Sequence, residues 1–103
     1  MVDRIMQIED KICRSIHDHK LLKITYKEDP ERIIEPYAYG LNRHGRKLSA
    51  YQISGFSTSG NVPHWKLFKV ELINRIEELD QQFKVRSNYN PDYKIIPGVI
   101  CKI

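Results

Sequence analysis

The sequence lacks any long hydrophobic run: its longest apolar stretches are only a few residues, too short for a membrane-spanning helix. The first ten residues, MVDRIMQIED, carry acids and no apolar stretch typical of a secretory signal peptide. These two absences predict a cytoplasmic protein without a membrane partner. At 103 residues, the chain can bury one core but not two.

Cysteine is scarce, with only Cys13 and Cys101, near opposite ends of the chain. No CxxC pair is present, and no Cys/His spacing suits zinc. We therefore expect no metal site, and we expect no cofactor. Because disulfides are rare in the cytosol, we also expect the two cysteines to be reduced, partly buried thiols.

Motifs of catalysis are missing too. The sequence has no GxSxG nucleophile motif and no GxxxxGK[ST] phosphate loop. A hydrolase would need His44 or His64 as base and Ser49, Ser57 or Ser59 as nucleophile, but no acid lies among them to orient the histidine. We therefore expect no enzymatic activity.

Acids are absent from Arg43 to Lys69, although this stretch holds five lysines and arginines and two histidines. The whole chain carries a net charge of +4. Tyr51 and Trp65 lie within the same stretch, and cations interleaved with aromatic rings suit single-stranded nucleic acid, since cations track phosphates while rings stack bases. The plainer alternative is a solvated basic face with Trp65 in the core.

Periodic patterns predict the secondary structure. Isoleucines spaced three and four apart predict an amphipathic helix over 3–19. Apolar and polar residues alternate over 22–26, which predicts a half-buried strand. Pro36 marks an edge, a bulge or a bend in the next strand. Further features are expected in this order: a strand over 32–41, a Gly-closed turn over 42–45, a strand over 46–54, a long loop over 55–64 and a strand over 65–70.

The C-terminal third is less regular. Residues 71–83 show helical spacing of apolar side chains. The tail beyond them is too apolar to stay in solvent, so we expect its isoleucines to be buried in the chain or against a second copy. These isoleucines are Ile95, Ile96, Ile100 and Ile103.

The order of several segments resembles a WYL domain over roughly residues 8–83. The segments are the N-terminal helix, LLKITYK, Glu35-Pro36, RKLSAYQ, Phe68-Lys69-Val70, and the closing Ile73, Ile76-Glu77-Glu78-Leu79 and Phe83. The three namesake positions of the family read Arg46-Lys47-Leu48 here, so only the leucine is kept. Cations at the first two positions favour phosphate attraction over stacking.

The resemblance implies a mainly β fold: a small five-stranded Sm-like barrel over 21–83, preceded by the helix over 3–19. It makes Asn74–Leu79 the last strand rather than a helix. Residues 1–83 would then form the WYL-like domain, and 84–103 a C-terminal extension that packs on the domain or on a partner.

The resemblance also implies a regulatory, ligand-sensing role, in transcription regulation or phage defence. With the basic stretch, it predicts binding of single-stranded nucleic acid or a nucleotide-like anion. The alternative is a non-catalytic protein–protein interaction module that forms a homodimer or docks on a partner regulator protein. The candidate binding residues are Arg43, Arg46, Lys47, Tyr51, Gln52, Ser57, Lys66, Lys69 and Arg75, and a second candidate, the loop over 54–60, could cradle an anion.

Overall fold

The computed structural model describes residues 4–57, 64–89 and 96–103. Its elements are α1 (Arg4–Asp18), β1 (Lys20–Tyr26), β2 (Arg32–Asn42), β3 (Gly45–Gly55), β4 (His64–Lys69), the short 3-10 helix η1 (Val70–Leu72), β5 (Ile73–Gln82) and β6 (Gly98–Lys102). The expected mainly β fold with one N-terminal helix is confirmed. Asp3, the first residue of the predicted helix, lies outside the described residues.

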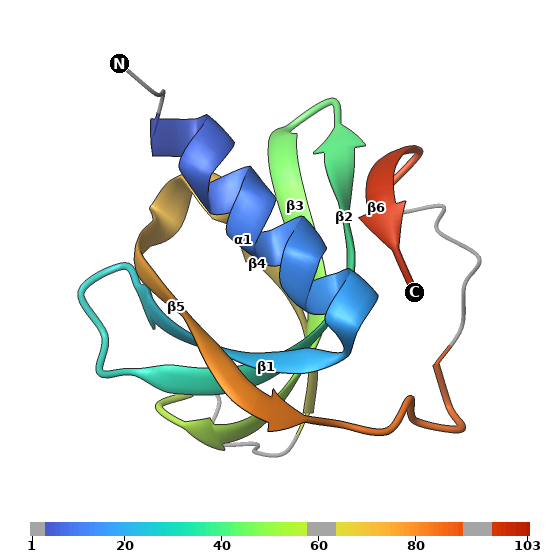
Figure 1. Cartoon of the computed structure of the whole chain (residues 1–103). Helices are drawn as coiled ribbons and strands as arrows, with labels where there is room; N and C mark the ends of the chain where they lie inside the picture. The colour runs from blue at the N-terminus through green and yellow to red at the C-terminus, as the bar shows by residue number, and fades with distance from the viewer. Residues whose placement is uncertain (1–3, 58–63, 90–95) are drawn as a thin grey trace.

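The strands form one antiparallel sheet in the order β4-β3-β2-β1-β5. The long strand β2 pairs with β3 along one edge. Along its other edge it pairs first with β1, through residues 32–34, and then with β6, through residues 38–41. Figure 1 shows β6 beside the far end of β2, while β5 and β1 curve together below α1.

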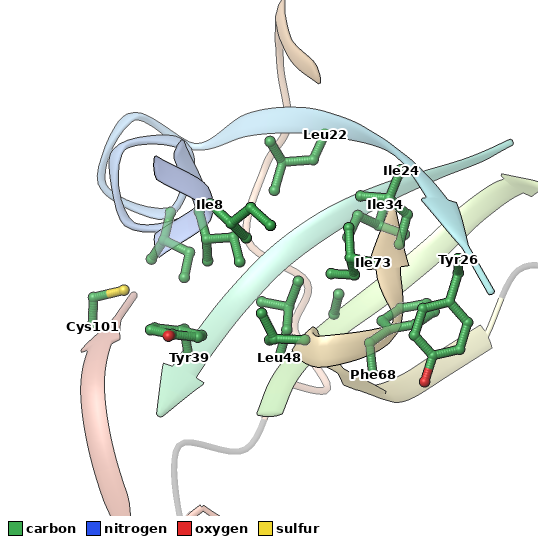
Figure 2. Close-up of a cluster of buried hydrophobic side chains, with 14 residues drawn as sticks. Ile8, Leu22, Ile24, Tyr26, Ile34, Tyr39, Leu48, Phe68, Ile73 and Cys101 are labelled. Carbon is green, nitrogen blue, oxygen red and sulfur yellow. The ribbon is translucent and has the colours of Figure 1, made fainter. Parts of the chain in front are cut away.

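The helix α1 covers one side of the curved sheet and contacts β1, β2, β5 and β6 (Figure 1). Its buried residues Ile8, Ile12 and Ile16 lie on one face, as their spacing predicted. They join apolar side chains from every neighbouring strand in the main core, part of which Figure 2 labels. Sheet and helix are thus held together by one continuous apolar cluster.

The strand β2 contains the predicted irregularity at Pro36. Its pairing with β3 shifts register between Pro36 and Ala38, so Tyr37 lies at a β-bulge. The predicted turn between β2 and β3 is confirmed, with Gly45 at a φ of +114°. These two features fix which side chains of β2 face the core and which face the opposite side of the sheet.

Strand β6 approaches β2 closely at Gly40. A Cβ atom at Gly40 would lie only 2.7 Å from the Cα of Val99 and from the side chain of Ile96. Only glycine leaves room for the pairing of β6 with β2 at this position.

Residues 73–82 form a strand, β5, as the family resemblance implied and against their helical spacing. Pairing of β5 with β1 satisfies its backbone, and this tertiary contact outweighs the local pattern. The expectation of five strands in a closed barrel needs correction. The described residues contain six strands because the apolar tail adds β6, and the sheet is not closed, since β4 and β5 lie at its two ends.

The expectation of two reduced thiols is wrong: Cys13 of α1 and Cys101 of β6 form a disulfide. The pairing of β6 with β2 brings the Cα atoms of the two cysteines to 5.7 Å, within the range that a disulfide bridges. The sequence could not show this because 88 residues separate the two positions.

The tail isoleucines differ in their burial. Ile96 is buried and Ile103 packs against the main core, whereas Ile100 is 46% exposed. Ile95 lies outside the described residues. No helix within the described ranges is long and apolar enough to cross a membrane.

Candidate nucleic-acid interface

The neighbouring strands β3 and β4 carry a ladder of cross-strand pairs on the face opposite the main core. Lys47 lies opposite Lys69, and Tyr51 lies opposite Trp65. Side chains alternate between the faces of a strand, so the two pairs share one face while Leu48, Ala50 and Phe68 point to the core. The pattern places a pair of cations and a pair of aromatic rings on one surface, which we call the ladder face.

The cations near the β2–β3 hairpin differ in exposure, and Arg46, one position before Lys47 on β3, lies on the face of the sheet opposite the ladder face. Arg43 and Lys69 are exposed, and the backbone N–H of Lys69 donates to the hydroxyl of Tyr26. Arg46 is half-buried and its Nε donates to the hydroxyl of Tyr39 at 3.1 Å. Lys47 is only 4% exposed, and its ammonium donates to the carbonyl of His44. Arg43 and Lys69 are therefore the cations best able to contact a phosphate.

An acidic side chain from outside the stretch over 43–69 lies against its hairpin in the folded structure. The carboxylate of Glu71, from η1, accepts a hydrogen bond of 2.9 Å from the backbone N–H of Arg46. This hydrogen bond, with the nearby Lys47 and Arg46 charges, lowers the pKa of Glu71. One negative charge therefore lies beside the hairpin and offsets part of its positive potential.

Five aromatic rings gather at the other end of the ladder face. Tyr37, at the bulge, lies 4.7 Å from Trp65 and 4.7 Å from Tyr89, measured between ring centroids. Phe83 also contacts Tyr37, and Tyr51 meets Trp65 edge-on at 5.2 Å. Burial raises the pKa of Tyr37 to about 12. Trp65 therefore lies in neither the main core nor open solvent.

An ion pair between a buried carboxylate and a partly exposed guanidinium lies beside these rings. The carboxylate of Glu35, whose side chain is only 6% exposed, accepts hydrogen bonds of 2.8 and 3.0 Å from Arg86. The hydroxyl of Tyr37 donates to the same carboxylate. The guanidinium carbon of Arg86 lies 3.8 Å from the centre of the Tyr51 ring. Arg86 therefore neutralises Glu35 and covers one face of Tyr51.

Sequence reasoning missed Tyr37, Glu35, Arg86 and Tyr89 as members of this site. Glu35 was noted only as part of the Glu35-Pro36 pair. No sequence signal places Arg86 on Tyr51, because 35 positions and two strands separate them. The Glu35–Arg86 pair likewise spans 51 residues.

Three other predicted residues lie in a corner beside the core. Gln52 is fully buried, accepts a hydrogen bond from Arg32 and donates one of 2.7 Å to the carbonyl of Phe56. Lys66 donates to the hydroxyl of Ser57 at 2.8 Å. Burial, and then the charge of Arg32, lower the pKa of Lys66. Because Lys66 pairs with Ala50, it points away from the ladder face.

Arg75 lies far from the ladder face in the sheet order, on β5, opposite Thr25 of β1. A surface pocket of about 250 Å³ adjoins it and also contains Glu31 and Glu77. The predicted residues thus divide into four places: the ladder face, the β2–β3 hairpin with Arg43 and Arg46, the Gln52 corner and the β5 edge. Of the anion-binding loop predicted over 54–60, residues 58–60 lie outside the described residues, and residues 54 and 55 belong to the end of β3.

A larger surface pocket, of about 450 Å³, lies next to the aromatic rings. Its lining includes Glu35, Ile53, Phe83 and Arg86. Among the described residues, no group of three or more His, Cys, Asp or Glu side chains is placed to hold a metal ion.

No family model matches the chain, and no curated protein or solved structure matches it either.

Proposed function

We propose that this chain is a non-catalytic domain that binds single-stranded nucleic acid or a nucleotide-like anion through the ladder face. The observation that carries the proposal is the register of β3 and β4, which places the exposed Lys69 on the same face as the Tyr51–Trp65 pair. Proteins that bind single strands of any nucleotide sequence use cations that attract the phosphates and aromatic rings that stack on the bases, and this surface offers both.

The fold contributes further support. The strand order β4-β3-β2-β1-β5, with a 3-10 turn between β4 and β5, suits an opened Sm-like barrel. We keep the relation to WYL domains, and a role in transcription regulation or phage defence, as part of the proposal. The helix before β1 and the strand at 73–82 agree with that relation.

Binding should depend steeply on salt, because each phosphate contact releases counterions. The test is a titration of labelled single-stranded oligonucleotide at several salt concentrations. Lys69→Ala should reduce the slope of log affinity against log salt by up to ~0.7. Arg75→Ala is the matched control, since Arg75 is also an exposed cation but lies on β5. Equal slopes for both variants, or no wild-type binding at low salt, would overturn the proposal.

The interaction-module alternative has its own observation. Leu41 is 40% exposed, Val99 36% and Ile100 46%, and all three belong to the paired strands β2 and β6. A homodimer or a partner regulator would bury them there. Light scattering decides this point: a dimer that Ile100→Asp converts to a monomer would favour the interaction module.

A further inference from the structure

The segment after β5, Phe83–Tyr89, lies over the aromatic part of the ladder face without forming a strand or helix. We infer that this segment is an autoinhibitory strap, which covers Tyr51 and its neighbours until nucleic acid displaces it. The inference rests on the proposed function and adds its regulation.

The first argument is the place of Arg86. Its guanidinium carbon, 3.8 Å from the centre of the Tyr51 ring, occupies a position that a stacked base would need. The Tyr51 ring is thus in contact with Trp65, at a T-shaped angle, and with the guanidinium of Arg86. A base can stack on the face of Tyr51 that Arg86 covers only after Arg86 moves.

The second argument is the way the strap is held. Within the described residues, its backbone is not paired as a strand, and it reaches the fold through the N–H of Phe83, which donates to the carbonyl of His19, and the N–H of Arg86, which donates to the hydroxyl of Tyr37. Side chains hold it as well: the Glu35–Arg86 pair, the ring of Phe83 against Tyr37 and His19, and Tyr89, whose ring packs on Tyr37 and Trp65 and whose hydroxyl donates to the carbonyl of Ile103. A segment whose backbone is not paired as a strand opens more readily than the sheet beneath it.

The third argument is that the strap has a defined closed position. Glu35 is buried and its carboxylate would lose its cation if Arg86 left, which favours closure in the absence of ligand. Bases that stack on the exposed rings would compensate for this loss. The equilibrium between the two states is therefore set by competition between one guanidinium and the bases of the ligand.

The test uses the direction of the change in affinity, because loss of a positive charge alone should weaken binding of a polyanion. Arg86→Gln removes a positive charge from a polyanion-binding protein, yet opening the strap should tighten binding of a labelled single-stranded oligothymidylate. Lys84→Gln is the matched control, because it removes the same charge from an exposed position of the same segment. We expect Arg86→Gln to bind about fivefold or more tightly than Lys84→Gln, as one stacked base would provide. Equal or weaker binding by Arg86→Gln would overturn the strap.

A second variant guards against misfolding around an unpaired carboxylate. Glu35→Gln combined with Arg86→Gln keeps the wild-type net charge and leaves no buried charge without a partner. With near-UV circular dichroism confirming its fold, this variant should bind more tightly than the wild type. Wild-type affinity in a folded double variant would contradict the inference.

A readout without nucleic acid separates the two proposals. Trp65 is the only tryptophan, and it lies 6.2 Å from Tyr89 of the strap. Quenching of its fluorescence by neutral acrylamide should increase in Arg86→Gln but not in Lys84→Gln. Unchanged quenching overturns the strap. No binding by any variant at low salt overturns the proposed function, and with it the inhibitory role, even if quenching increases.

Discussion

Arg86 and Glu35 are 51 residues apart in sequence, yet the guanidinium of Arg86 donates both Nε and Nη2 to the carboxylate of Glu35. The carboxylate is buried and the guanidinium is about a third exposed, with exposed fractions of 6% and 36%. The pair ties the segment after β5 to the middle of β2, next to the bulge at Tyr37.

Breaking this pair from the arginine side should destabilise the protein. Arg86→Gln leaves the Glu35 carboxylate buried, and we expect a loss of about 1–3 kcal/mol in the free energy of unfolding. The double variant with Glu35→Gln should recover part of that loss. Urea unfolding of the wild type, of the single variants Arg86→Gln and Glu35→Gln, and of the double variant measures the coupling free energy between the two side chains. Additive effects of the two substitutions would show that the pair contributes no net stability.

The disulfide should stabilise the chain strongly. It closes a long loop between Cys13 and Cys101, and chain-entropy arguments give a contribution of about 4–5 kcal/mol. Thermal unfolding with and without dithiothreitol should show a large decrease in the melting temperature on reduction. The variant with both cysteines changed to serine should have the same melting temperature as the reduced wild type, and dithiothreitol should not change it. A wild type whose melting temperature dithiothreitol also leaves unchanged would contradict a contribution from the disulfide.

Alkaline pH should ionise Tyr37 and Tyr39 late. Burial raises the pKa of Tyr37 and of Tyr39 to about 12, against an ordinary value of 10.0. Both hydroxyls favour the protonated form in the fold, so the stability they contribute is complete below pH 10 and is lost as pH rises toward about 12. Absorbance titration of the wild type should show tyrosine ionisation near pH 12, and Tyr37→Phe should reduce the amplitude of that late step.

Glu71 should weaken anion binding. Its carboxylate lies at the hairpin and accepts a hydrogen bond from the backbone of Arg46. Glu71→Gln keeps an acceptor oxygen but removes the charge, so affinity for single-stranded oligonucleotide should rise by up to about fivefold, or ~1 kcal/mol. Glu77→Gln, on β5, is the control and should have a smaller effect. Equal effects would mean that only net charge matters.

Local patterns in the sequence predicted those parts of the fold that local forces determine. The isoleucine spacing located α1, alternation located β1, and Asn42–Gly45 located the hairpin. Tertiary contacts determine the rest. The strand at 73–82 forms because β1 offers it an edge, and Cys13 meets Cys101 only after β6 has paired with β2.

The candidate site could be predicted only in part, because some of its members are brought together by tertiary contacts. Lys69 and Tyr51 were found from charge and aromatic content, and the register places both on the ladder face. The same content could not show that Lys66 faces the other side, since that depends on which residues of β4 are buried. Nor could it place Arg86 on Tyr51, a contact made by a segment without regular structure.

The measurement that most directly tests the central claim is a map of amide chemical shifts on titration with single-stranded oligonucleotide at low salt. The account predicts that the largest shifts fall on residues 43–51 and 65–69, with the amides of Arg75 and Glu77 unchanged. Largest shifts on β5, or no shifts at all, would contradict binding through the ladder face.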